Sequence, residues 1–197
     1  MVNTLYGRTR TVQYRRKRTG RTDYKRRLAL LKSEQPRLVV RKSLKHITAQ
    51  LVEYHPDGDR IVASANSHDL EKMGWKGYTA NTSAAYLVGL LIGKRAVQKK
   101  IKNAVLDIGL AAKGSKIFAA AKGAVDGGLD IPLDPVILPK DERIHGGHIV
   151  NYAAALKKDA AAYQRRFSHY STAKLNPEDL TMHVEQLKKK IIAEYNN

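Results

Sequence analysis

The sequence predicts a mixed α/β protein (α+β mixed), in which a three-stranded antiparallel meander and one parallel strand are packed by helices in the order β-β-β-α-β-α. Two observations predict this fold. Three short segments between residues 37 and 65 alternate apolar with polar side chains. A long apolar segment with helical spacing then separates them from a fourth apolar segment at about residues 104–110.

The three alternating segments predict the meander. We expect strands at Arg37–Ser43, His46–Tyr54 and Arg60–Ala65, with a turn at Pro56-Asp57-Gly58 before the third. Side chains in a strand alternate between the two faces of the sheet. One face is therefore expected to be buried, with Leu38, Val40, Ile47, Ala49 and Leu51. The other face is polar and partly basic, with Arg37, Val39, Arg41, His46, Thr48 and Gln50.

The central helix is predicted to begin after the capping sequence Asn81-Thr82-Ser83 and to run to about Lys100. Gly89 and Gly93 lie four residues apart, on one side of this helix, and we expect them to allow close packing on the sheet. The segment from Asn66 to Ala80, before the helix, is expected to be a loop.

The second half of the core is predicted to contain one strand and one helix. Ala104–Leu110 reads as a short, fully buried strand, and because a helix precedes it, it should lie parallel to its neighbour. Ser115 is expected to cap a helix from Lys116 to Asp126. The three prolines between Asp130 and Arg143 predict irregular backbone there.

The chain is expected to have three parts: an RNA-binding arm (1–27), disordered when free; a mixed-sheet RNA-binding core (28–134); and a loop with a helical C-terminal extension (135–197). Leu28–Lys32 is expected to be a short apolar turn that docks the arm. In the extension, Ile149–Phe167 should be helical, Ser168–Leu175 a linker, and Asn176 the cap of a last helix with Pro177 at its first position. Leu180, Val184, Leu187 and Ile191 form the apolar stripe of that last helix.

The arm carries an unusual concentration of charge. Tyr6–Arg27 contains ten Lys or Arg residues and one acid, so its net charge of +9 is half of the chain's +18. Its apolar content is too small to offset the entropy of ordering. Tyr6, Tyr14 and Tyr24 lie among the arginines, and flat rings beside cations suit a partner with phosphates and bases. RNA is the favoured partner; a solvated tail or an anionic membrane surface is the alternative.

The remaining composition excludes several classes. The chain has no cysteine, so it has no disulfides and no Cys-based zinc site. The N-terminus lacks the apolar segment of a signal peptide. The longest apolar run is about half of the ~20 residues that a membrane span needs. We expect a soluble, intracellular protein with no membrane partner, no cofactor and no small-molecule substrate.

Four motifs resemble catalytic or ligand-binding sites. The Gly109–Lys116 loop has Ser before Lys, the reverse of a nucleotide-binding P-loop, so we expect Lys113 and Lys116 to hold an RNA phosphate. Ser67-His68-Asp69 are adjacent and cannot converge as a triad, which favours a helix start or a turn. His145 and His148 do not complete a zinc shell. Asp107 is interpreted as a buried, hydrogen-bonded structural residue.

In combination, several segments resemble a known family, the large-subunit ribosomal proteins of the universal L-eighteen family, of the archaeal and eukaryotic type. The matching segments are Tyr14–Tyr24, Pro36–Ser43, His46-Ile47, Ala84–Leu87, Ala104–Gly109, Gly114–Ala119 and Lys122–Ala124. Leu44 stands where many members have Asn, and Ala80 where a Gly is common.

The resemblance implies a non-enzymatic constituent of the large ribosomal subunit in the cytoplasm. It implies binding to 5S rRNA and to 23S-type rRNA in the central protuberance, beside neighbouring ribosomal proteins that include the universal L-five protein. The alternatives are an RNA-processing nuclease that uses Asp107 with magnesium and a basic DNA-binding protein.

The expected RNA-binding residues come from the arm, the first two strands and two loops, and the charge pattern and the resemblance give nearly the same set. They are Arg8, Arg10, Tyr14, Arg15, Arg16, Lys17, Arg18, Arg21, Tyr24, Lys25, Arg26, Arg27, Arg37, Arg41, Lys42, Ser43, Lys45, His46, Lys76, Tyr78, Thr79, Lys113, Ser115 and Lys116.

Overall fold

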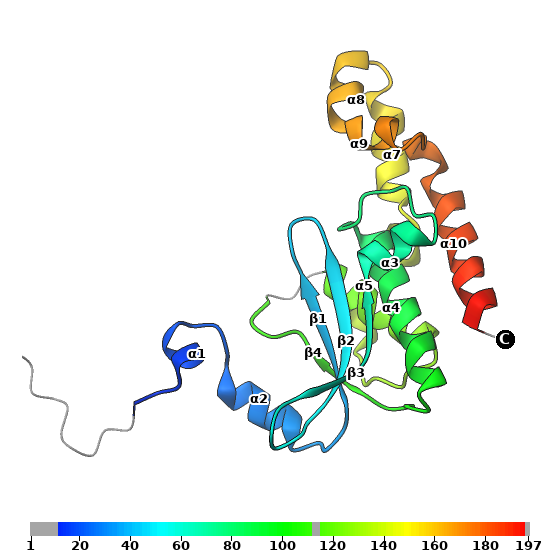
Figure 1. Ribbon diagram of the computed structural model, residues 1–197. Helices are drawn as coiled ribbons and strands as arrows, with labels where there is room; N and C mark the ends of the chain where they lie inside the picture. The colour runs from blue at the N-terminus through cyan, green and yellow to red at the C-terminus, as the bar shows by residue number, and fades with distance from the viewer. Residues whose placement is uncertain (1–11, 112–114, 196–197) are drawn as a thin grey trace, which may run out of the picture.

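A single mixed sheet lies at the centre of the protein, as a computed structural model shows for residues 12–111 and 115–195 (Figure 1). Its strands are β1 (Arg37–Lys42), β2 (Ile47–Glu53), β3 (Arg60–Asn66) and β4 (Val105–Asp107). They lie in the order β3-β2-β1-β4. Strand β2 is antiparallel to both β1 and β3, and β4 is parallel to β1. The predicted meander and the parallel fourth strand are confirmed.

The two faces of the sheet differ as the alternation predicted. The inward residues Leu38, Val40, Ile47, Ala49 and Leu51 are all at most 1% exposed. On the opposite face the strand register forms two cross-strand rows that are polar except for Val39: Val39 with Gln50 and Ser64, and Arg41 with Thr48 and Asn66. The buried face packs against helices, which leaves the polar rows available for other contacts.

Two helices cover the buried face of the sheet (Figure 1). They are α4 (Thr82–Gln98) and α5 (Ser115–Asp126). The side chain of Asn81 accepts a hydrogen bond from the backbone N–H of Ala84 and so caps α4 as predicted. Helix α5 begins at Ser115, one residue before the predicted start at Lys116.

Glycines bring α4 and α5 unusually close together. A Cβ atom on Gly89 would overlap the carbonyl oxygen of Ala120, and one on Gly123 would overlap that of Tyr86. Gly93 lies in the same way against Ala124 and Gly127. These glycines therefore serve a helix–helix contact, and the expectation that Gly89 and Gly93 pack on the sheet was wrong.

Three segments expected to be irregular or extended differ in the structure. The Leu28–Lys32 turn belongs to a helix, α2 (Tyr24–Leu31), and the Asn66–Ala80 loop contains the helix α3 (Ser67–Lys72). The Asn66 side chain and Asp69 cap α3 reciprocally, a local signal at its first turn. Strand β4 has only three residues, and two of them are partly exposed, so it is shorter and less buried than predicted.

The arm contains a second, shorter helix, α1 (Arg15–Arg18), which precedes α2. Asp23 caps α2 by accepting a hydrogen bond from the backbone N–H of Arg26 at 3.0 Å. Figure 1 shows α1 and α2 projecting from one end of the sheet. The expectation that residues 1–27 are disordered when free stays a prediction.

The C-terminal extension is more divided than predicted. Its elements are η1 (Pro135–Ile137), α6 (Asp141–Ile144), α7 (Gly147–Leu156), α8 (Ala160–Arg166), α9 (Ser168–Thr172), η2 (Pro177–Asp179) and α10 (Leu180–Tyr195). The helix expected over Ile149–Phe167 breaks before Asp159, which caps α8. The expected linker Ser168–Leu175 contains α9.

The last helix is confirmed in its main features. Leu180, Val184, Leu187 and Ile191 are buried, and α10 packs on α4 on the side away from the sheet. Asn176 makes no side-chain capping bond; Pro177 instead begins a 3₁₀ turn that leads into α10. Within the described ranges, no helix combines the length and the apolar character needed to cross a membrane.

Candidate nucleic-acid interface

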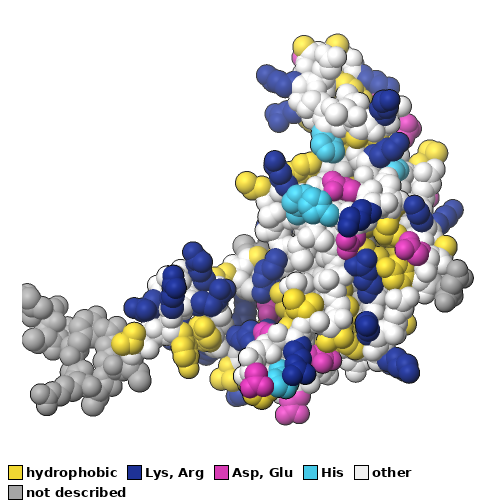
Figure 2. Space-filling model, viewed as in Figure 1, with side chains coloured by type: hydrophobic (Ala, Val, Ile, Leu, Met, Phe, Trp, Pro, Cys, Tyr) yellow, Lys and Arg dark blue, Asp and Glu magenta, His cyan; other side chains and the backbone are white. Residues whose placement is uncertain are grey.

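A groove of about 720 Å³ lies between the arm and the ends of β1 and β4. Six cationic residues line it: Arg16, Arg21, Arg26, Arg27, Arg41 and Lys42. The C-terminal end of β1 contributes the last two, and the residues after β4 form the opposite wall. Figure 2 shows Lys and Arg side chains crowded over the arm and continuing toward the sheet. We call this site the basic groove.

Specific contacts hold the arm in position beside the groove. A guanidinium nitrogen of Arg26 donates to the carbonyl oxygen of Gly109, after β4, at 3.0 Å. Nη2 of Arg27 lies 2.9 Å from the Asp59 carboxylate, which precedes β3. Within the arm, Nε of Arg16 donates to Oγ1 of Thr22 at 2.8 Å. The arm is therefore connected to two separate parts of the core.

Two tyrosines predicted to face RNA lie against each other on the arm. The rings of Tyr14 and Tyr24 have centroids 5.0 Å apart and are tilted by 36°. Tyr14 remains 71% exposed. The pair gives the arm a small aromatic surface beside its cations, and aromatic rings beside arginines can stack on bases or riboses.

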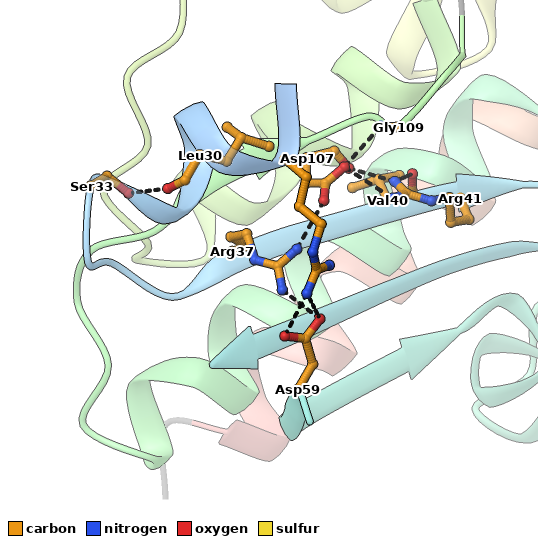
Figure 3. A network of polar contacts seen from close by, with 9 residues as sticks. Leu30, Ser33, Arg37, Val40, Arg41, Asp59, Asp107 and Gly109 are labelled. Atoms are coloured by element: carbon orange, nitrogen blue, oxygen red, sulfur yellow. Dashed lines mark hydrogen bonds and ion pairs between the residues drawn. The ribbon is translucent and has the colours of Figure 1, made fainter. Parts of the chain in front are cut away.

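A buried ion-pair network lies beneath the groove (Figure 3). The two terminal nitrogens of Arg37 contact the carboxylates of Asp107 at 3.2 Å and Asp59 at 2.7 Å. Asp107 also accepts hydrogen bonds from Nη2 of Arg41 at 2.9 Å and from the backbone N–H of Gly109 at 2.8 Å. These contacts fix the end of β4 against β1.

Arg37 is therefore not a surface cation. Its side chain is 2% exposed and its guanidinium faces two carboxylates, so we remove it from the expected RNA-binding set. Strand alternation assigns a face to a side chain, but it does not show that the side chain is buried between two carboxylates, which argues against a direct contact of Arg37 with RNA. Asp107, by contrast, is the buried, hydrogen-bonded residue that the sequence predicted.

Asp59 connects the arm to this network. Burial raises the pKa of its carboxyl group, but hydrogen bonds from Arg37 and Arg27 outweigh that effect and lower the pKa below its ordinary value. Asp59 is thus ionised throughout the neutral range. Its position directly after a Pro-Asp-Gly turn, where an acidic residue is common for local reasons, gives no sign of this role in the sequence.

A second group of predicted residues lies at the β1–β2 turn. Two loops meet there, because the Tyr78 hydroxyl donates to the carbonyl of Leu44 at 2.8 Å and the Thr79 hydroxyl donates to that of Lys45 at 2.5 Å. Lys45 is exposed, whereas Thr79 is only 6% exposed. Thr79 therefore positions the turn, and its hydroxyl is already occupied.

The expected set thus separates into two surfaces. The basic groove gathers the arm with Arg41 and Lys42, and the turn gathers Ser43, Lys45 and His46 with Lys76 and Tyr78. Lys116 lies in the first turn of α5. The exposed arm cations Arg15, Lys17, Arg18 and Lys25 lie outside the groove lining. Arg8, Arg10 and Lys113, and the side chain of Ser115, fall outside the described residues.

No group of three or more His, Asp or Glu side chains suited to a metal ion occurs within the described residues. The carboxylate of Asp107 is not available to a metal ion, because two arginines and a backbone amide already contact its oxygens. Burial and the charge of Arg143 lower the pKa of His148, which favours its neutral form.

A mixed sheet with a cationic groove and a turn with exposed basic residues indicates a nucleic-acid-binding type of protein. Comparison with known proteins identifies the family to which the chain belongs. Residues 8–104 and 98–134 match the family model described as ribosomal large subunit proteins 60S L5 and 50S L18. The chain is also 54% identical to the large ribosomal subunit protein uL18 of Methanococcus maripaludis over 183 residues, which cover 92% of this chain and 95% of that protein.

The chain therefore belongs to this family of large-subunit ribosomal proteins. The resemblance inferred from short sequence segments is confirmed. The similarity to the Methanococcus maripaludis protein extends beyond the sheet and through most of the chain.

Proposed function

We propose that this protein binds 5S rRNA and helps to attach it to 23S-type rRNA in the central protuberance of the large ribosomal subunit. Its role there is structural and not catalytic, and its protein neighbours include the universal L-five protein. Family membership supports a place in the large subunit. The choice of 5S rRNA rests on the sequence segments that resemble the L-eighteen family.

The observation that carries the proposal is the basic groove. Six cations line one groove of about 720 Å³, and the arm beside it brings further exposed cations. Guanidinium groups bind phosphates through paired hydrogen bonds. The arm and the groove can together follow an RNA backbone, while the polar rows of the sheet meet the adjoining surface.

The ion-pair network gives this interface a fixed base. Arg26 and Arg27 contact Gly109 and Asp59, and these contacts place α2 at the groove. A docked helix loses less conformational entropy on binding than a free one. The residues before α2 can then follow the RNA outward from a defined starting point.

The nuclease alternative is disfavoured by the surroundings of Asp107. A magnesium-dependent nuclease needs carboxylate oxygens that contact the metal. Both oxygens of Asp107 instead face guanidinium nitrogens. Asp107→Asn should therefore affect stability, and a metal-dependent cleavage activity that this change abolishes would support the nuclease.

Salt-dependent binding of a 5S rRNA transcript tests the proposal. Each phosphate neutralised adds roughly 0.7 to 0.9 to the slope of log affinity against log salt. Replacing Arg15, Lys17 and Arg18 by Gln should lower that slope by about two units. The matched control replaces Lys99, Lys100 and Lys102, exposed after α4, and should change it much less.

The choice of RNA is tested separately. The protein should bind the 5S rRNA transcript more tightly than a duplex DNA of equal length at the same salt concentration. Equal affinity for the two would support the basic DNA-binding alternative. Equal effects of the arm and control substitutions would contradict the role of the arm.

A further inference from the structure

The ring of His46, at the end of the β1–β2 turn, lies against the ring of His68 in α3. The rings of His46 and His68 have centroids 3.9 Å apart and are tilted by only 33°. His46 follows β1 closely, whereas His68 is in the first turn of α3, so the pair depends on the tertiary fold. The side chain of His68 is still 55% exposed. One part of its ring lies on His46, and the rest faces solvent.

Hydrogen bonds hold both rings in place. Nδ1 of His46 lies 3.2 Å from the Ser67 hydroxyl, and Nδ1 of His68 lies 2.8 Å from Oε2 of Glu71. Helix α3 is itself anchored, because Asp69 in its first turn forms an ion pair with Arg95 of α4 at 2.8 Å. The stacked rings are therefore presented from a fixed position.

Exposed apolar and basic residues lie close to His46 along the chain and in the loop that contacts its turn. Leu44 at the tip of the turn is 91% exposed, and its carbonyl oxygen accepts the hydrogen bond from Tyr78. Lys45, which follows Leu44, and Lys76, two residues before Tyr78, are both exposed. Figure 2 shows histidine side chains grouped on the surface between the sheet and the C-terminal helices. The Leu44 side chain therefore buries almost no apolar surface in the structure.

We propose that His46, His68, Leu44 and Tyr78 form a platform on which an unpaired RNA nucleotide stacks, with Lys45 and Lys76 beside its phosphates. We call this surface the histidine platform. The inference rests on the proposed function and deepens it, because it names the kind of RNA element that is recognised. His68 and Leu44 enter the RNA-binding surface here for the first time.

The chemistry of the platform selects an unpaired nucleotide over a duplex. Bases within an RNA helix already stack on each other, and the major groove is too deep and narrow for side chains to reach them. Contacts with phosphates alone would need the lysines but neither a flat ring nor an exposed leucine. Stacking on an exposed aromatic ring, by contrast, is available to any base that is extruded from a helix.

The test compares two RNA hairpins that differ only in one bulged adenosine. The full-length protein should bind the bulged hairpin more tightly, and His68→Ala should reduce its affinity for that hairpin by about tenfold. The affinity for the paired hairpin should change little. His68→Phe keeps a flat ring and should retain most of the preference. His55→Ala, in the distant β2–β3 turn, is the control histidine.

The outcomes separate this inference from the proposed function. If His68→Ala weakens both hairpins equally, or neither, while the wild-type protein still binds 5S rRNA, the platform is overturned and the function stands. If the wild-type protein binds the 5S rRNA transcript no more tightly than duplex DNA, the proposed function itself fails. Thermal unfolding of each variant shows whether a loss of binding reflects a loss of fold.

Discussion

Nε2 of His183 accepts a hydrogen bond from the backbone N–H of Lys76 at 3.1 Å, although the two residues are far apart in the sequence. The His183 ring also stacks on Trp75, with centroids 5.2 Å apart. Close by, Nζ of Lys190 donates to the carbonyl oxygen of Met73 at 2.7 Å. Helix α10 thus fixes the loop that contains Lys76 and Tyr78, and the C-terminal extension positions part of the surface that we propose for RNA.

Acidification should weaken this contact. Burial, and then the charge of Lys76, lower the pKa of His183 below its ordinary value of 6.5. The folded protein therefore binds this proton less tightly than the unfolded chain does. The free energy of unfolding should fall as the pH drops from 6.5 toward the lower folded pKa, and should not depend on this group at higher pH.

The variant His183→Phe checks this pH effect. Phenylalanine keeps a ring against Trp75 but neither titrates nor accepts the bond from Lys76. Urea unfolding below neutral pH should show a smaller loss of stability in the variant than in the wild type, and part of the loss should persist because the pKa of His148 is also lowered. An unchanged pH dependence would contradict the assignment. His55→Phe is the matched control.

Arg37→Ala should destabilise the fold strongly. The substitution leaves Asp107 buried without one of its two cations and also removes a partner of Asp59. Breaking a buried ion pair by removing one partner costs about 3 to 5 kcal/mol. Arg41→Ala is the control, because its side chain is 48% exposed and its loss should cost much less. Urea denaturation measures both, and equal costs would contradict the structural role of Arg37.

Gly89→Ala should also destabilise, against the usual trend. In most helices this change stabilises by about 1 kcal/mol, because glycine is a poor helix former. Here the new methyl group would overlap the backbone of α5 at Ala120, which cannot move without separating the helices. We expect a net loss of about 2 kcal/mol in urea unfolding. Ala154→Gly, at an exposed site in α7, measures the ordinary propensity difference, and a stabilised Gly89→Ala protein would contradict the close contact.

Arg27 and Arg15 should contribute differently to RNA binding, although the sequence makes them equivalent. The Asp59 carboxylate contacts Arg27, whereas Arg15 is exposed in α1 and forms no ion pair with the described residues. Arg15→Gln should lower the salt slope by about 0.7 to 0.9, the value for one phosphate. Arg27→Gln should change the slope less. Equal changes in binding titrations with 5S rRNA would show that RNA displaces Asp59.

The sequence by itself determined the features that depend on local pattern. Strand alternation gave the buried set from Leu38 to Leu51, capping chemistry gave the start of α4, and the apolar stripe of α10 was correct. The charge of the arm indicated a polyanionic partner before any fold was known. These inferences held because alternation, capping and net charge depend on residues that are close in the chain.

Only the tertiary structure decided which cations are free and which are used internally. Arg37 and Arg41 share a predicted strand face, yet one is buried between Asp59 and Asp107 and the other is half exposed. The glycines of α4 contact α5 rather than the sheet, and the ring contact of His46 with His68 requires the β1–β2 turn and α3 to meet. Burial and ion pairing depend on segments distant in sequence, because the desolvation of a charge is set by everything that packs around it and not by its neighbours in the chain.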